Sequence, residues 1–184
     1  MVERRTASEP SYGVTARALH WLVVLVLLLQ FAIAWTMPEI HRGTQPERLI
    51  SLHLSFGILI LVLVMARLVW RLGHPVPLIS DNVPRWQRQA AQVTHGIFYV
   101  LLMLLPLMGW ANASARGWTI EVFGIFVLPH ILPAGSAIGQ RLGDVHTFTA
   151  YVLLSLAGLH VAAAMYHHFW LRDRVLSRML PGRN

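Results

Sequence analysis

Long runs of apolar residues, separated by short polar stretches, dominate the hydropathy pattern of this chain. Four of these runs, near residues 18–37, 50–70, 92–112 and 145–168, are long enough to cross a bilayer. A spanning helix needs about 20 apolar residues, and in lipid it must satisfy all of its backbone hydrogen bonds internally. The pattern therefore predicts an all-α fold, an integral membrane four-helix bundle, with residues 1–184 as a single membrane domain.

The segments that connect the later runs differ in character. Residues 71–89, RLGHPVPLISDNVPRWQRQ, contain prolines and polar side chains that are typical of a surface loop. Residues 113–144 include WTIEVFGIFVLPHILP, which is apolar but too short and too interrupted by proline to span. We expect this stretch to lie on the membrane surface or to fold over the mouth of the bundle.

The first apolar run has a second interpretation as a signal peptide. Arg4, Arg5 and Arg17 precede it, and AIA at residues 32–34 is similar to a cleavage site. We favour a spanning helix, because the apolar run continues through Trp35 and its removal would leave only three spans.

The composition supports a membrane protein. Only 12% of the 184 residues are charged, whereas soluble domains contain about 25%. The formal net charge is +7, but the arginines lie between apolar runs and form no basic face, so we expect no nucleic-acid partner. Cysteine is absent, which excludes disulfides, thiolate-held iron–sulfur clusters and covalent haem attachment. Histidines are then the main candidates for holding a metal or cofactor.

The arginines also predict the orientation, because positive charge accumulates in cytoplasmic loops. A topology of four spans divides the arginines unequally between the two sides and places both termini in the cytoplasm. One side carries Arg4, Arg5, Arg17, Arg67, Arg71, Arg85, Arg88, Arg172, Arg174, Arg178 and Arg183, and the other carries Arg42, Arg48, Arg116 and Arg141.

Two histidines bracket the most apolar part of the last run, VHTFTAYVLLSLAGLH. Fourteen residues separate His146 from His160, which on a helix is about 40° short of four turns and about 21 Å along the axis. Both imidazoles therefore share one face at two depths. Ionisable residues inside a span are rare and are candidates for a functional site.

The remaining histidines can be assigned depths from the same topology. His53 lies at the outer level of His146, while His20 and His95 lie at the inner level of His160. Paired imidazoles from facing helices are what a six-coordinate b-type haem requires, and two layers would conduct electrons across the membrane.

Two alternatives to haem binding remain. Single histidines at span ends commonly bond to water or lipid headgroups, an interpretation that we adopt for His41, His74 and His130 in the loops. A zinc or copper transporter would need ligands that converge at one depth with carboxylates nearby, and the acidic residues lie outside the predicted spans.

Several motifs resemble the bacterial cytochrome b561 family, which is related to the cytochrome b subunits of nickel–iron hydrogenases. The resemblance covers nearly the whole chain, and its most specific part is the last motif. The motifs are HW at 20–21, HLSFGI from His53, RLVWRL at 67–72, THGIFYVLL from His95, LPLMGW at 105–110 and GLHVAAAMYHHFW at 158–170.

The resemblance implies two non-covalent haem b groups in an inner-membrane respiratory oxidoreductase that exchanges electrons with ubiquinone. It pairs His20 with His160 and His53 with His146 as iron ligands, and it leaves His95 without an axial role. Some members are similar to superoxide oxidase. The outer loops here contain four arginines and four acids, so a basic funnel for superoxide is not obvious, although Arg116 and Arg141 could form one locally.

Four further residues are candidates by their position at the inner level. Arg67, fourteen residues after His53, and Arg17, one turn before His20, are expected to bind haem propionates. His167 lies on the His160 face about 10 Å further toward the cytoplasm, and with His168 it is expected to serve the quinone site as a proton donor.

A second function remains open. The chain could instead be an electron-carrying membrane anchor for a periplasmic dehydrogenase or hydrogenase, with a periplasmic redox partner in place of a substrate of its own. Its short length and lack of a soluble domain suit either function.

Overall fold

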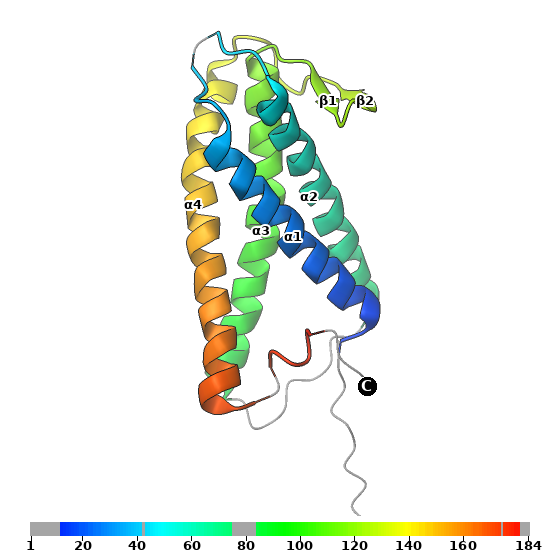
Figure 1. Ribbon diagram of the computed structural model, residues 1–184, viewed down its shortest axis with the longest axis vertical. Coiled ribbons are helices and arrows are strands. Elements are labelled where there is room, and N and C mark those ends of the chain that lie inside the picture. The colour runs from blue at the N-terminus through cyan, green and yellow to red at the C-terminus, as the bar shows by residue number, and fades with distance from the viewer. Residues whose placement is uncertain (1–11, 42, 75–83, 174, 181–184) are drawn as a thin grey trace, which may run out of the picture.

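The computed structural model describes residues 12–41, 43–74, 84–173 and 175–180. Four long helices dominate it, together with one small hairpin and a short π-helical turn (Figure 1). The elements are α1 (Val14–Thr36), α2 (Arg48–Gly73), α3 (Arg85–Ala115), β1 (Ile120–Val122), β2 (Phe126–Leu128), α4 (Ala137–Tyr166) and η1 (His167–Leu171).

All four helices are long and apolar enough to span a membrane, so the predicted four-span helical fold is confirmed. Each helix begins earlier than its predicted apolar run; α3 begins at Arg85 rather than near residue 92, and α4 begins at Ala137 rather than near residue 145. The predicted loop is described only at its ends, because residues 75–83 lie outside the described part of the chain. Arg4, Arg5, Arg42, Arg174 and Arg183 of the orientation argument also lie outside it.

The helices run alternately up and down (Figure 1). The start of α1 and the C-terminal segment lie at the same end of the bundle, because Arg17 donates to the carbonyl oxygen of Leu180. We call this the inner end and the hairpin end the outer end. Helix α1 packs mainly against α2, α2 against α3, and α3 against α4; among the described residues, α1 and α4 make no comparably extensive contact. The bundle is therefore least closely packed between α1 and α4.

Two apolar clusters hold the helices together. Within the spans, Val23 and Val26 of α1 pack against Ile60 and Val64 of α2. At the outer end, side chains from α2, α3 and the hairpin region form a second cluster that contains Ile50, Ala113, Trp118 and Ile120. Many of the other large apolar side chains of the helices are exposed, as expected for surfaces that face lipid.

Helices α3 and α4 approach closely at the outer end because small residues line their contact. A Cβ on Gly139 would overlap the side chain of Ala115 and lie 3.0 Å from the carbonyl oxygen of Ala111. Asn112 of α3 donates to the carbonyl oxygen of Gly139 at 2.9 Å, and Ser136 caps the start of α4. These contacts fix the outer half of α4 against α3.

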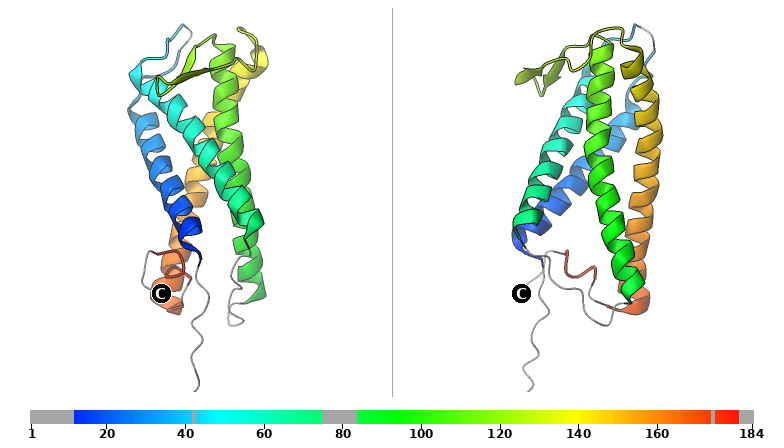
Figure 2. Two further views of the ribbon diagram at one scale, coloured as in Figure 1. Left: turned by 90° about the vertical axis from the view of Figure 1, so that its right-hand side faces the viewer. Right: turned by 180° about the vertical axis from the view of Figure 1, so that it is seen from behind.

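The segment between α3 and α4 contains secondary structure that the sequence did not predict. It contains the antiparallel hairpin β1–β2, in which Ile120 pairs with Leu128 and Val122 with Phe126. The hairpin projects sideways from the outer end of the bundle beyond α2, as Figure 1 and the right view of Figure 2 show.

Candidate functional site

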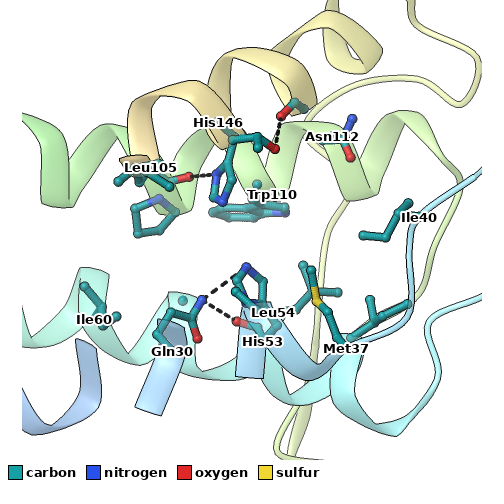
Figure 3. Close-up of a pocket in the computed structure, with 18 of the residues that line it drawn as sticks. Gln30, Met37, Ile40, His53, Leu54, Ile60, Leu105, Trp110, Asn112 and His146 are labelled. Atoms are coloured by element: carbon teal, nitrogen blue, oxygen red, sulfur yellow. Dashed lines mark hydrogen bonds between the residues drawn. The ribbon is translucent and has the colours of Figure 1, made fainter. Parts of the chain in front are cut away.

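A cavity of about 330 Å³ lies in the outer half of the bundle, where α1 and α4 are least closely packed. His53 from α2 and His146 from α4 face each other across it (Figure 3). Their ring centroids are 6.1 Å apart and their planes are inclined by 70°. The remaining lining is mostly apolar and includes Leu27, Phe31, Leu54, Leu102 and Leu153.

His146 is oriented by α3. Its Nδ1 lies 2.9 Å from the carbonyl oxygen of Leu105, so this nitrogen carries the proton and donates (Figure 3). The ring also lies against Gly109, where an added Cβ would be 3.4 Å from Cε1 of His146. A carbonyl partner on one ring nitrogen fixes the tautomer and leaves the lone pair of Nε2 for a metal ion.

His53 contacts Gln30, a residue that the sequence analysis missed. The amide nitrogen of Gln30 donates to the carbonyl oxygen of His53 at 3.0 Å and lies 3.3 Å from its Nε2 (Figure 3). Gly57 lies close to the same amide nitrogen, from which an added Cβ would be 3.5 Å away, an ordinary contact distance. The signal was present in the sequence, because Gln30 is a lone amide within an apolar run.

These residues fit the predicted haem. Two imidazoles that bind one metal ion from opposite sides, at metal–nitrogen distances of about 2 Å, bring their ring centroids to about 6 Å apart. The spacing of His53 and His146 matches this arrangement, and an apolar cavity is the usual environment of a macrocycle. The buried Nδ1 of His53 has no hydrogen-bond partner among the described residues, so this ligand is less firmly oriented than His146.

The described residues do not provide the ligands that a zinc or copper site of a transporter would need. Within the described parts of the chain, no group of three or more histidine, aspartate, glutamate or cysteine side chains is arranged so that it could hold a metal ion. Zinc sites of the common tetrahedral kind need three or four such ligands. The two-histidine geometry therefore favours haem.

Three histidines approach one another at the inner level. The rings of His95 and His160 are 5.7 Å apart and inclined by 67°, and His20 is close enough to interact electrostatically with both. Phe98 lies edge-on to His160 at 5.4 Å, and Trp21 lies edge-on to His20 at 5.5 Å. The structure thus brings two candidate partners, His20 and His95, to the level of His160.

The two candidate arginines have different surroundings. Arg67 donates from Nε to the hydroxyl of Tyr99 at 3.2 Å, and its charge acts on His20 and His160. Arg17 donates from Nη1 to the carbonyl oxygen of Leu180 at 3.1 Å, so part of its guanidinium is used by the C-terminal segment. Arg67 is the better placed of the two to reach a group bound at the inner level.

His167 and His168 lie where α4 ends. Both belong to the π-helical turn η1, after which Arg172 adopts a left-handed conformation with φ of 51°. This reversal brings Oδ2 of Asp173 to Nδ1 of His167, at 2.5 Å. His168 is exposed and lies edge-on to Phe169. Asp173 is a second residue that the sequence analysis missed. The only feature of the sequence that pointed to this contact was an aspartate six residues after a histidine.

The loop histidines make local contacts at the described ends of the bundle. His41 lies 3.3 Å from a carboxylate oxygen of Glu39, and His74 stacks on Trp70. Nε2 of His130 lies 3.1 Å from the carbonyl oxygen of Trp118.

Comparisons with known proteins agree with this geometry. Residues 11–182 match the family model described as prokaryotic cytochrome b561. "Probable superoxide oxidase CybB" of Yersinia pestis is 34% identical over 174 residues, which cover 92% of this chain and 96% of that protein. "Cytochrome b561 homolog 2" of Escherichia coli strain K12 is 31% identical over 176 residues, covering 95% and 94%. "Cytochrome b562" of Cereibacter sphaeroides is 26% identical over 181 residues, covering 95% and 98%.

The family match spans nearly the whole chain, and two relatives exceed 30% identity over almost their full lengths. The resemblance noted from the motifs is therefore confirmed. With its four spanning helices and facing histidines, the chain belongs to the prokaryotic cytochrome b561 family, whose members are electron-transferring membrane cytochromes that bind haem b.

Proposed function

We propose that this protein is a di-haem b-type cytochrome that transfers electrons between a donor on the outer side of the membrane and ubiquinone on the inner side. The observation that carries the proposal is the separation of 6.1 Å between the His53 and His146 rings across an apolar cavity. The inner site contains His160 from the same helix, fourteen residues and about 21 Å further along α4. One helix thus contributes a ligand to both layers.

Haem b, when bound, supplies reversible one-electron oxidation and reduction. The chain's own residues hold it and keep water away: His53 and His146 bind the iron at the outer site, and Leu105 orients His146. At the inner site we assign His20 and His160 as ligands, on the family resemblance together with their shared depth. Arg67 binds a propionate there, with Tyr99 supporting its guanidinium.

His95 is the competing inner ligand, because its ring is 5.7 Å from that of His160. The two assignments differ in a simple test. Under our proposal, His20→Ala loses the inner haem and His95→Ala keeps it, as measured by haem content and the reduced optical spectrum. The reverse result would assign His95 instead.

Superoxide is the donor that we propose. The Yersinia pestis relative is named as a probable superoxide oxidase, and the lining of the outer cavity includes the guanidinium-bearing Arg116. A positive charge at the mouth of a low-dielectric cavity attracts a small anion. Asp144 also lines the cavity, so we expect the attraction to depend on Arg116 locally rather than on the net charge of the outer surface.

At the inner end, we propose that quinone binds beside His167 and His168. Quinone that receives electrons must also receive protons, and histidine can donate them near neutral pH. Asp173 holds Nδ1 of His167, which leaves Nε2 available to a bound quinone. Arg17 and Trp21 help to enclose this end, because each donates to a backbone carbonyl of the C-terminal segment, at 3.1 and 2.8 Å.

The orientation belongs to the same proposal. The distribution of arginines favours both termini in the cytoplasm, and membership of the prokaryotic cytochrome b561 family favours the bacterial inner membrane. Reporter fusions to the C-terminus should then be active only as cytoplasmic reporters. Activity of a periplasmic reporter at that position would mean that the C-terminus lies outside the cytoplasm. The proposed direction of electron transfer across the membrane would then be reversed.

The decisive experiment uses the purified protein in detergent with a water-soluble ubiquinone. We expect an optical spectrum of bis-histidine haem b, rapid haem reduction by enzymatically generated superoxide, and quinone reduction that superoxide dismutase abolishes. An anchor subunit would instead co-purify with a periplasmic dehydrogenase or hydrogenase, and superoxide would reduce its haem no faster than a control cytochrome. That outcome would favour the alternative function.

A further inference from the structure

The tip of the β1–β2 hairpin is apolar and exposed. Phe123, Ile125, Phe126 and Val127 have exposed fractions of 42, 79, 49 and 59%. The segment from Val122 to the following proline contains no charged residue. A water-facing hairpin in a soluble protein would expose polar side chains at these positions, so the tip has the composition of a contact surface.

The turn itself is built with an unfavourable residue. Phe123 has φ of 51° and Gly124 has φ of 70°, and the nitrogen of Ile125 donates to the carbonyl oxygen of Val122 at 3.0 Å. In hairpins that face water, positions with positive φ are usually occupied by glycine, asparagine or aspartate, and a bulky side chain there is strained. The chain places an aromatic residue at such a position, so this turn differs in composition from the turns of water-facing hairpins.

The hairpin is attached to a spanning helix well inside its outer end. The backbone nitrogen of Phe123 donates to Oγ of Ser55 at 3.0 Å, and the ring of Phe123 lies edge-on to Phe56 at 5.2 Å. Ser55 is seven residues after Arg48, the first residue of α2, which is about 10 Å along the helix axis. The tip therefore lies at the depth where headgroups give way to hydrocarbon, not above the membrane.

We propose that the hairpin tip inserts into the outer leaflet beside α2. Lipid is the occupant that the geometry favours, because the tip continues the exposed apolar surface of the spanning helices and projects away from the bundle (Figure 2). Aromatic and aliphatic side chains are common at this membrane boundary. The insertion would also hold Ser55 at a constant depth, and with it His53, two residues earlier on α2.

The absence of cysteine allows a direct test in the full-length protein. Single variants Ile125→Cys, Glu39→Cys and Leu28→Cys would carry a nitroxide label in vesicles of phosphatidylcholine and phosphatidylglycerol. Glu39, whose side chain is 88% exposed in the α1–α2 connection, is the water reference, and Leu28, 66% exposed in the middle of α1, is the lipid reference. The measurement is the collision rate of each label with oxygen, which concentrates in lipid, and with a water-soluble nickel chelate.

We expect the ratio of oxygen to nickel collisions at residue 125 to exceed that at residue 39 several-fold and to approach that at residue 28. A ratio equal to that of residue 39 would place the tip in water and overturn the proposal. Shielding from both reagents, as a protein partner or a second copy of the chain would produce, would also overturn it. Unchanged circular dichroism would show that each labelled chain is folded, and the outcome does not depend on the proposed electron transfer.

Discussion

Replacing His53 by alanine is the most informative change at the outer cavity. Under the proposed di-haem assignment, this substitution removes one of the two ligands of the outer haem, and His146 alone remains in position. We expect loss of the outer haem and retention of the inner one. The haem-to-protein ratio should fall from about two to about one, because the two sites share no ligand.

The structure indicates how complete this loss should be. The rings of His53 and His146 meet only across the cavity, and among the described residues no other histidine approaches either ring. We therefore expect no other histidine of the described residues to replace His53 as an iron ligand. The alanine leaves a space the size of an imidazole next to Gly57 and Gln30, so added imidazole should bind there and restore a six-coordinate spectrum.

The assay measures haem as its pyridine complex, together with reduced-minus-oxidised spectra with and without imidazole. His130→Ala is the matched control, because His130 also lies at the outer end, does not line the cavity, and has its ring nitrogen against the Trp118 carbonyl oxygen. It should retain both haems. Two haems in His53→Ala, without added imidazole, would refute the ligand assignment, and loss of all haem that imidazole does not reverse would show that the sites are not separate.

Four further predictions address the inner site and the fold. Arg67→Gln should lower inner-haem retention or shift its midpoint potential, measured by redox titration, whereas an unchanged titration would exclude the propionate contact. His167→Leu should keep both haems and their reduction by superoxide while quinone reduction slows at least tenfold, because a positioned proton donor typically contributes about a hundredfold or more to a rate; a normal rate would place the quinone site elsewhere. Asp173→Asn should alter the pH profile of quinone reduction more than its rate at the optimum, since Asp173 acts through His167. Gly139→Ala should destabilise the protein by about 1–3 kcal/mol in chemical denaturation, because its Cβ would overlap Ala115, and a neutral effect would mean that α3 and α4 separate easily.

The membrane spans could be predicted from the sequence because hydrocarbon imposes one simple requirement, a long apolar helix. The same requirement explains the boundary errors. Hydropathy detects only the apolar centre of a span, whereas the polar ends of α3 and α4 continue as helix into the headgroup region. The levels of the histidines followed from chain direction and residue count alone, and His53 does meet His146 in the structure.

Other features could not be predicted from the same patterns. Each hairpin strand has three residues, too few for an alternating pattern to stand out. The contact between Asp173 and His167 depends on the left-handed conformation of Arg172, which no periodicity encodes. The approach of His95 to His160 depends on how α3 and α4 are rotated about their axes, and depth along the chain gives no information on rotation.

Helix α4 carries His146 and His160 on one continuous helix, and this has a consequence for how the cofactors are acquired. Any rotation or axial shift of α4 moves both imidazoles together, because a helix without a break transmits such a displacement along its length. Binding of a first haem would fix the rotation of α4 and so prepare the ligand of the second site. The entropy cost of ordering α4 would then fall on the binding of the first haem alone. The second haem should therefore bind more tightly than the first. We therefore expect uptake of haem by the apoprotein to be cooperative, with few singly loaded chains at half saturation.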